Sequence, residues 1–216
     1  MIKINYEKRW DNLRSSLGEK DAFVAALPGN TRYLANSESP PGTPPSSTMN
    51  YVVIPKKGEP IAITSSLEEH RCRHESSVND IRCWTTYPDI KSDGKSALEI
   101  LKSSLKEIKA KQIFADTKVS LGRSFKSSVS SNLNELRSIK SEAELERIKK
   151  AIKQSDDGQR FAYNLVESGE GLSEKEVRSE IDYFMARKGI QENSFSTIIA
   201  SGPNSAHSHH SNTDRK

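Results

Sequence analysis

Apolar positions at the front of the chain predict a helix and then a buried strand. They recur every three or four residues up to Gly18, a spacing typical of an amphipathic helix. The four residues that carry this period are Tyr6, Trp10, Leu13 and Leu17. The apolar run at 22–27 predicts a strand buried on both faces, closed by a turn at 28–30 and followed by a short helix at 31–35. A long loop at 36–47 comes next, because its prolines exclude both a helix and a central strand.

The middle of the chain alternates strand patterns with helix patterns. Two strand patterns flank a turn at 56–59 and predict a hairpin. The predicted strands are 51–54, 60–64, 80–84 and 112–115, the predicted helices are 67–76, 97–108 and 120–128, and an extended piece is predicted at 132–136. Strands that alternate with helices indicate an α/β layered domain.

Two capping boxes announce two helices in the last third of the chain. Ser141 precedes Glu144 by three positions, and Ser173 precedes Glu176 in the same way. At this spacing each side chain hydrogen-bonds the backbone N–H of the other residue. The apolar residues expected on these helices are Leu145, Ile148, Ile152, Ala162, Leu165 and Val166 in the first, and Val177, Ile181 and Phe184 in the second. The two helices are expected to end near 169 and at 189.

After the second helix, the pattern predicts one more strand. Aromatic and β-branched residues gather at 195–199 and are followed by Gly202-Pro203, which predicts a buried strand that runs into a turn. Two helices and one strand are too few to bury both faces of an α+β unit, so a large exposed apolar patch is expected. A second copy of the chain would cover that patch in a homodimer. The residues expected in the patch are Val177, Ile181, Phe184, Ile198 and Ile199.

Composition and charge narrow the class of protein. Of the 216 residues 33% are hydrophobic and 29% charged, so the core is modest and the surface heavily solvated. The 33 basic and 29 acidic residues are interspersed without a basic block, so nucleic acid is not an expected partner. No apolar run approaches membrane-spanning length, and residues 1–5 lack the apolar centre of a signal peptide. We therefore expect a cytoplasmic location and no membrane partner.

Two cysteines offer a candidate zinc site. Cys72 and Cys83 do not make a disulfide framework in a chain of this size and are expected to be reduced. His70 and His74 lie near them in the sequence, so four zinc ligands are available. The spacing matches no common paired-ligand pattern, and two histidines four apart on an arginine-rich helix are more simply a solvated face.

Three histidines close to the end of the chain form a second candidate. His207, His209 and His210 follow the predicted strand, and imidazoles bind metals or transfer protons near neutral pH. The only carboxylate of this loop is Asp214, so a hard-metal site is not predicted from the loop alone. The alternative interpretation is an exposed polar tail.

Three segments, in order along the chain, are similar to segments of one known family. They are Asn30-Thr31-Arg32-Tyr33-Leu34, which has the form Asn-x-x-Tyr-Leu, and residues 136–151 and 198–206. They resemble the N-terminal domain motif, the linker with the first catalytic-domain helix, and the approach to the active site of the creatinase/prolidase/aminopeptidase P metallopeptidases, peptidase family M24. The resemblance implies a creatinase-like N-terminal domain at 1–137, with a mixed sheet flanked by helices. It implies the truncated start of an α+β pita-bread catalytic domain at 138–216.

The resemblance also implies a hydrolase. Family members are Xaa-Pro dipeptidases and aminopeptidases, in which two divalent metal ions (Mn, Co or Zn) held by two Asp, one His and two Glu cleave the bond before a proline. All five ligands follow the position that matches Lys216, so no metal ligand is assigned here and this chain is expected to be inactive by itself. Proline-containing peptides are the implied partners. The alternatives are a non-catalytic peptide-binding module of the same fold and a creatinase-type amidinohydrolase.

The resemblance assigns a role to the histidines. His209 matches the family histidine that contacts the substrate and the developing tetrahedral intermediate, so it is the expected catalytic residue. His209 and His210 are the expected substrate-binding residues. The chain departs from the family at His207, where an aliphatic residue is usual, at Ser208, where proline is usual, and at His210, where glycine or tyrosine is usual. Which imidazole faces the site therefore stays open.

Overall fold

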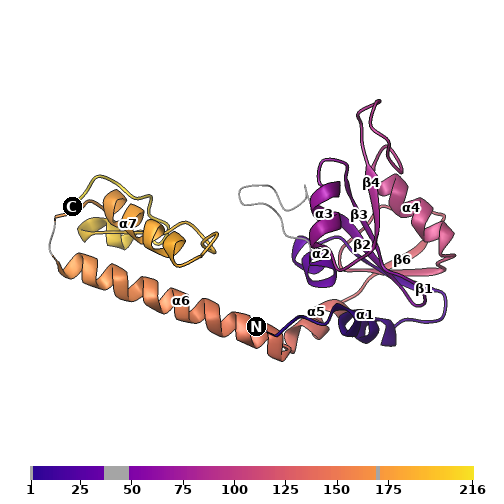
Figure 1. Cartoon of the computed structure of the whole chain (residues 1–216), viewed down its shortest axis with the longest axis horizontal. Coiled ribbons are helices and arrows are strands. Elements are labelled where there is room, and N and C mark those ends of the chain that lie inside the picture. The colour runs from indigo at the N-terminus through magenta and orange to yellow at the C-terminus, as the bar shows by residue number, and fades with distance from the viewer. Residues whose placement is uncertain (1, 37–48, 169–170) are drawn as a thin grey trace. The chain divides into compact units, whose positions relative to one another are not determined.

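The computed structural model describes residues 2–36, 49–168 and 171–216 (Figure 1). These residues divide into two compact units, one formed by Lys3–Lys140 and one formed by Ser141–Lys216 with Ile2. The assignment of 1–137 to a creatinase-like domain and of 138–216 to the start of a pita-bread domain stays a prediction. The loop predicted at 36–47 lies, apart from Asn36, outside the described residues.

A six-stranded sheet forms the centre of the first unit, with strand order β4-β3-β2-β1-β5-β6. The strands are β1 (Asp21–Ala25), β2 (Met49–Pro55), β3 (Ile61–Ser65), β4 (Asp80–Trp84), β5 (Gln112–Ala115) and β6 (Lys126–Val129). The pairs β1–β2 and β2–β3 are antiparallel, whereas β3–β4, β1–β5 and β5–β6 are parallel. The sheet is therefore mixed, and the expected α/β class with a mixed sheet flanked by helices is confirmed.

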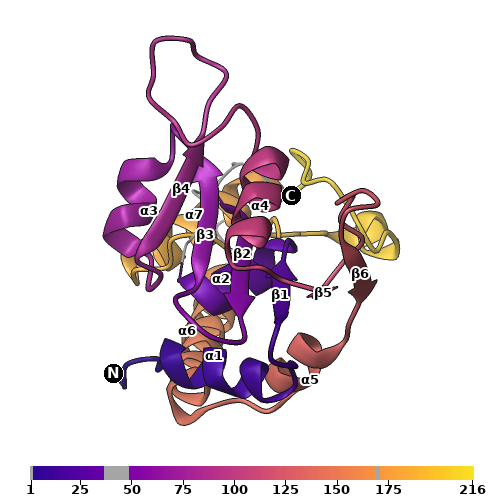
Figure 2. The same ribbon diagram turned by 90° about the vertical axis from the view of Figure 1, so that its right-hand side faces the viewer.

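Helices cover both faces of this sheet (Figure 2). They are α1 (Tyr6–Ser15), α2 (Pro28–Ala35), α3 (Glu69–Glu75), α4 (Ala97–Glu107) and α5 (Asn132–Ser138). Side chains of α1, α2, α3 and α5 share one core with one face of the sheet, and α4 shares a second core with the other face. Strand β1 supplies both cores in alternation, with Phe23 in the first and Val24 in the second, as expected of a strand buried on both faces.

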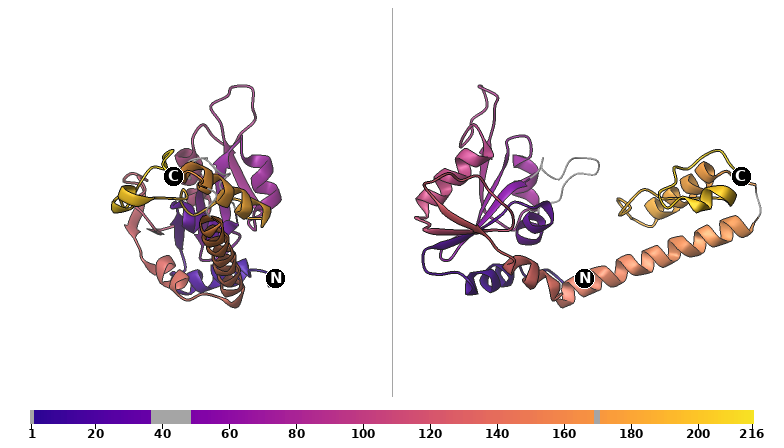
Figure 3. Two further views of the ribbon diagram at one scale, coloured as in Figure 1. Left: turned by 90° about the vertical axis from the view of Figure 1, so that its left-hand side faces the viewer. Right: turned by 180° about the vertical axis from the view of Figure 1, so that it is seen from behind.

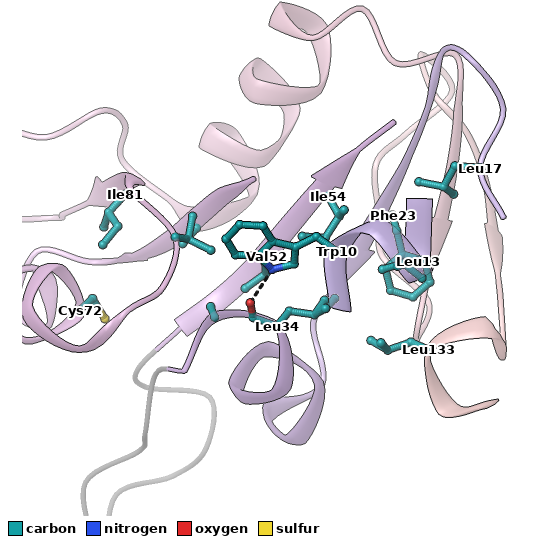
Figure 4. Close-up of a cluster of buried hydrophobic side chains, with 14 of the residues drawn as sticks. Trp10, Leu13, Leu17, Phe23, Leu34, Val52, Ile54, Cys72, Ile81 and Leu133 are labelled. Atoms are coloured by element: carbon teal, nitrogen blue, oxygen red, sulfur yellow. Dashed lines mark hydrogen bonds between the residues drawn. The ribbon is translucent and has the colours of Figure 1, made fainter. Parts of the chain in front are cut away.

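The first core combines apolar packing with one satisfied polar group (Figure 4). Trp10 and Leu13 of α1 pack with Phe23 and Leu34, and the indole N–H of Trp10 donates a hydrogen bond of 2.8 Å to the carbonyl of Leu34. A buried Trp N–H without a partner would destabilise the fold, so this bond allows a large aromatic side chain to fill the core. The predicted first helix is confirmed, as are the hairpin, the helices at 67–76 and 97–108, and strands β4 and β5.

Three predictions for this unit were wrong. The segment 28–30 is not a turn after β1 but the first turn of α2, where Pro28 fits because the first helical residue needs no N–H donor. The helix predicted at 120–128 is a loop followed by strand β6. Leu121 and Phe125, four apart as in a helix, pack against the second core from that loop, and Gly122 has a φ of +82°, outside helical values.

The third error is the extended piece predicted at 132–136, which is helix α5. Leu133 is buried and Leu136 packs against the same first core, three positions further on, so helical spacing brings both to one face. Strand β6 escaped prediction because all four of its residues are exposed, which leaves no alternation of apolar and polar positions to recognise.

Two helices and a short 3₁₀ turn form the second unit: α6 (Glu142–Glu167), α7 (Glu174–Arg187) and η2 (Gly202–Ala206). Helix α7 lies alongside α6 (Figure 3). The rings of Phe161 and Phe184 stack with centroids 4.3 Å apart, and a Cβ at Gly158 would lie 2.6 Å from the sulfur of Met185. Both predicted capping boxes are confirmed.

Two predictions for the second unit were wrong. Val177 and Ile181, expected in an exposed apolar patch, are 7% and 8% exposed and therefore buried, whereas Ile198 is 39% exposed. The strand predicted at 195–199 is absent, since the described residues of this unit contain no strand, and Phe195 is 73% exposed. A strand needs a neighbour for its backbone groups, and in this segment side chains take that place. No helix among the described residues is long and apolar enough to cross a membrane.

Candidate functional site

A buried carboxylate at the start of α7 organises the chain that carries the three histidines. Glu174 Oε1 accepts hydrogen bonds from the backbone N–H and hydroxyl of Ser201, at 2.7 and 3.0 Å, and from the amide of Asn204, at 2.9 Å. Its Oε2 accepts from His210 Nε2, at 2.7 Å, and from the backbone N–H and hydroxyl of Thr213, at 2.9 and 2.8 Å. We call Glu174, Ser201, Asn204, His210 and Thr213 the Glu174 cluster.

The backbone of α7 adds two further bonds to the cluster. The N–H of Glu174 donates to the carbonyl of Arg215, at 2.9 Å, and the N–H of Lys175 donates to the carbonyl of Thr213, at 3.2 Å. The first N–H groups of a helix have no partner within the helix, so the end of the chain supplies one for each of them. The last residues, yellow in Figure 1, therefore return to the N-terminal turn of α7.

A second carboxylate of α7 holds the segment that leads to the cluster. Asp182 Oδ1 accepts hydrogen bonds from Asn193 Nδ2, at 2.9 Å, and from the hydroxyl of Thr197, at 2.6 Å. Asn212 accepts from the N–H of Ile199, at 3.4 Å, and donates to the carbonyl of Thr197, at 3.2 Å. The side-chain amide of Asn212 thus serves as a partner for the extended backbone, as a neighbouring strand would.

Electrostatics keep Glu174 ionised. Burial of its side chain, of which 1% is exposed, is the largest single influence and acts to raise its pKa, whereas hydrogen bonds from the side chains of Asn204 and His210 act to lower it. Together with the backbone N–H groups at 201 and 213, they hold the pKa of Glu174 well below its usual range. An ionised carboxylate only accepts hydrogen bonds, so His210 Nε2 carries the hydrogen of this bond.

The three histidines lie in different surroundings. The side chain of His210 is 9% exposed and is held by Glu174, as described. His207 lies near it, with ring centroids 6.5 Å apart, and its backbone N–H donates to the carbonyl of Asn204, at 3.0 Å. His209, the expected catalytic residue, is exposed. His207 is exposed as well, so the structure separates two exposed histidines from one that is tied into the fold.

The donor groups near the histidines do not fit a metal centre. Within the ranges that the structure describes, no three His, Cys, Asp or Glu side chains are grouped so that they would hold a metal ion. Glu174 already accepts six hydrogen bonds, which a metal would have to displace. The exposed Asp214 forms an ion pair with Lys175 at 3.0 Å. We therefore derive no catalytic step through a metal on these residues.

The cysteine candidate is part of the first core. Cys72 is buried with its sulfur 3.7 Å from the hydroxyl of Thr64, whereas His70 and His74 are exposed on α3. Cys83 is also buried, and burial, with a smaller contribution from the Glu69 carboxylate, raises the pKa of its thiol to about 12. A thiol with so high a pKa is a poor nucleophile and a poor metal ligand.

Sequence reasoning missed Glu174, Asn204 and Thr213 as members of a site. Glu174 stands between the two residues of a capping box, where an acidic side chain is common because it favours the positive end of the helix dipole. Its partners follow 27 to 39 positions later in the chain. No local pattern could have joined them. The one available signal was the presence of Ser201 and Asn204 within the segment 198–206, which resembles the family's active-site approach.

The fold of the chain is similar to that of solved prolidases. The Xaa-Pro dipeptidase from Bacillus anthracis matches over 98% of this chain with a TM-score of 0.73 and 22% identity. The prolidase from Thermococcus sibiricus matches over 100% of it with a TM-score of 0.72 and 23% identity. This chain covers 57% and 59% of the lengths of those two chains. The fold is therefore that of the front part of a prolidase-like protein.

Sequence comparisons find similarity in the last third of the chain. Residues 146–216 match metallopeptidase family M24. The Xaa-Pro dipeptidases of Pyrococcus horikoshii and Pyrococcus furiosus are each 37% identical over 84 residues, a stretch that makes up 39% of this chain and 23% and 24% of those proteins. Residues 146–216 are therefore similar to metallopeptidase family M24 and to Xaa-Pro dipeptidases, and the resemblance seen in the sequence is confirmed.

Proposed function

We propose that this chain is the N-terminal portion of an Xaa-Pro dipeptidase or aminopeptidase, a hydrolase that cleaves the peptide bond before a proline. The observation that carries the proposal is the match of residues 146–216 to family M24. The prolidase-like fold of the chain supports it. Proline-containing peptides are the substrates that the names of these relatives suggest.

His209 is the residue that we propose to contact the substrate. Its imidazole is exposed, whereas Nε2 of His210 is already bonded to Glu174, which leaves only Nδ1 of His210 for a substrate group. A hydrogen bond from His209 to the scissile carbonyl would strengthen as negative charge develops on that oxygen, an effect typically worth about 3 kcal/mol of transition-state stabilisation. His210 would complete the substrate contacts from its fixed position.

The chain by itself is proposed to be inactive. The family implies two divalent metal ions, which supply hydroxide at neutral pH when they are bound. The described residues offer no fitting group of ligands for them, and the resemblance assigns the five ligands to positions after the one that matches Lys216. This chain would therefore lack the nucleophile, whichever of Mn, Co or Zn is supplied.

An assay of this chain tests the proposal of inactivity. The purified protein is incubated with an Xaa-Pro dipeptide and with a longer Xaa-Pro peptide, each with added manganese, cobalt or zinc. We expect no hydrolysis above background. Turnover that survives repurification and disappears with a chelator would contradict the proposal. Binding of the longer peptide without hydrolysis, measured by calorimetry, would instead support the peptide-binding module. Hydrolysis of creatine without added metal would support the amidinohydrolase.

The role of His209 needs a form of the protein that carries the five ligands. In that form, His209→Ala should lower kcat about tenfold or more with its metal content unchanged, since it removes one donor to the oxyanion. His207→Ala is the matched control and should change kcat by less than about twofold. An equal effect of the two substitutions, or loss of metal from His209→Ala, would show that the role belongs to another histidine.

A further inference from the structure

Glu174 joins the two ends of the loop that carries the histidines. Ser201 lies just before this loop and Thr213 just after it. Oε1 of Glu174 accepts from the N–H of Ser201, and Oε2 accepts from the N–H of Thr213. Asn204 and His210, within the loop, donate to the same two oxygens. Residues 202–212, which we call the histidine loop, are therefore closed by a single side chain.

The helix itself does not need this carboxylate. The N-terminus of α7 is capped by Ser173 and Glu176, whose hydroxyl and carboxylate bond each other's backbone N–H groups. Glu174 turns away from that exchange and lies buried under the histidine loop. A buried acidic residue beside a complete capping box has a purpose other than capping.

We infer that Glu174 is a positioning residue that fixes the histidine loop and with it His209. The inference rests on the proposed function of His209 in contacting the substrate. On one side of His209, the turn at 202–206 is tied to Glu174 through Asn204, and on the other side the adjacent His210 is tied to it directly. The backbone of His209 thus lies between an anchored turn, five positions before it at Asn204, and an anchored neighbour, His210, while its exposed side chain stays available.

The chemistry of the cluster requires an ionised carboxylate of this length. All six partners of Glu174 donate, so both of its oxygens must be acceptors. In Glu174→Gln one oxygen becomes an amide nitrogen, which turns its hydrogens toward the backbone N–H of either Ser201 or Thr213. A backbone N–H can only donate, whereas a hydroxyl or an imidazole can also accept. The N–H that faces the new amide group would lose its acceptor, so one end of the loop would be released.

The first experiment compares Glu174→Gln with Glu180→Gln in the complete 216-residue chain. Glu180 is exposed on the same helix and undergoes the same change of charge. In Glu174→Gln we expect amide exchange at Ser201 and Thr213 to accelerate about tenfold or more, and the heteronuclear NOE of the His209 amide to fall. Amides near Ile181, further along α7, should change by less than about twofold.

Two results would overturn the inference at this stage. Unchanged exchange at Ser201 and Thr213 in Glu174→Gln would show that the loop does not depend on the carboxylate. Equal acceleration at Ile181 and at the loop would show that the substitution unfolds the whole unit, so that Glu174 supports the helix rather than positioning the loop. Glu180→Gln should match the wild type in every one of these measurements.

A milder pair of variants tests the same hydrogen bonds in case Glu174→Gln does not fold. Thr213→Val keeps the shape of the side chain but removes the hydroxyl that donates to Glu174 at 2.8 Å, and Thr213→Ser retains the hydroxyl. We expect Thr213→Val to accelerate exchange at Ser201 and Thr213 by about threefold, and Thr213→Ser to restore the wild-type rates. Identical behaviour of the two variants would contradict a role for the hydrogen bonds of the cluster.

Kinetics separate this inference from the proposed function. In a form that carries the five ligands, Glu174→Gln should lower kcat about tenfold while KM changes by less than about threefold and metal content stays constant. An effect of His209→Ala without an effect of Glu174→Gln would overturn the positioning role alone. If His209→Ala has no effect on kcat, the proposed function fails, and the exchange data still decide whether Glu174 fixes the loop.

Discussion

In each unit, one buried polar side chain holds together segments that lie far apart in the sequence. Asn30, the first residue of the Asn-x-x-Tyr-Leu motif, is fully buried, with its amide 2.9 Å from Asp116 and its carbonyl oxygen bonded to Arg137. Asp116 also accepts the N–H groups of Ala26 and Leu27, so one network joins the segment before α2 to residues from after β5 and from α5. Glu174 has the same role in the second unit. In both cases one side chain meets backbone or side-chain groups far apart in the sequence.

Asn30→Ala should lower the free energy of unfolding of the first unit by about 2 kcal/mol, because Asp116 and Arg137 would lose their buried partner. Asn12→Ala, an exposed change on α1, is the control and should alter it by no more than about 0.5 kcal/mol. Urea denaturation followed by tryptophan fluorescence reports on this unit, since both tryptophans, Trp10 and Trp84, lie in it. Equal midpoints for the two variants would refute the prediction.

The low pKa of Glu174 makes a prediction about pH. The pKa of Glu174 is lower in the folded state than in the unfolded state. The stabilisation from this carboxylate is therefore fully present above the unfolded pKa, and it is lost progressively as the pH falls from that value to and through the folded one. Between about pH 5 and pH 3 the difference in stability between wild type and Glu174→Gln should therefore shrink.

The readout for this pH prediction is the urea midpoint of helix loss in the second unit, from amide signals of α6 and α7. Glu180→Gln should differ from the wild type by the same amount at every pH, since the exposed Glu180 lies outside the cluster. The other charged or titratable groups of this region are unchanged in both variants; they are Lys175, Glu176, His207, His209, His210, Asp214, Arg215 and Lys216. A gap for Glu174→Gln that stays constant with pH would contradict the prediction.

Helix α7 makes two kinds of contact in the second unit: polar contacts with the chain that follows it and apolar contacts with α6. Its carboxylates at Glu174 and Asp182 hold the extended chain that follows it, so polar contacts replace strand pairing there. Its contacts with α6 include apolar ones, with Phe184 stacked on Phe161 and Met185 packed over Gly158. The absence of a side chain at Gly158 permits this close approach, even though glycine lowers helix stability.

Gly158→Val should destabilise the packing of α6 against α7 by about 1–3 kcal/mol, because a branched side chain would overlap the sulfur of Met185. Ala151→Val is the matched control: it adds a similar bulk on an exposed position of α6 and should cost only about 0.5 kcal/mol of helix propensity. Chemical denaturation followed by amide signals of α7 measures both. An equal loss of stability in the two variants would show that the space between residue 158 and Met185 can hold a larger side chain.

At the scale of the whole molecule, the two units differ in how their backbone groups are satisfied. In the first unit β1 lies between β2 and β5, and β5 between β1 and β6, so both strands have hydrogen-bonded neighbours on each side. In the second unit the described residues after α7 contain no strand, and large apolar side chains such as Phe195 are exposed. We expect the second unit to be the less stable one.

Hydrogen exchange on the intact chain should reveal this difference. Amides of β1 and β5 should exchange slowest, those at 191–200 fastest, and the N–H groups of Ser201 and Thr213 at an intermediate rate because Glu174 holds them. Uniform protection across both units would contradict the prediction. If that protection also increased with protein concentration, it would support a homodimer that covers the exposed apolar side chains of the second unit.

Local patterns in the sequence determined the elements whose cause is local. Some features depend only on residues close together in the sequence, within one or two helical turns or one strand, and these could be predicted. They are the period of α1 and α4, the two capping boxes and the bounds of β4 and β5. The resemblance likewise marked His209 and His210. Only the tertiary structure decided that β6 is a strand, since its exposed residues are defined by pairing with β5. It alone decided that Glu174 closes the histidine loop, because its hydrogen-bond partners are brought to it by the fold and not by the order of the chain.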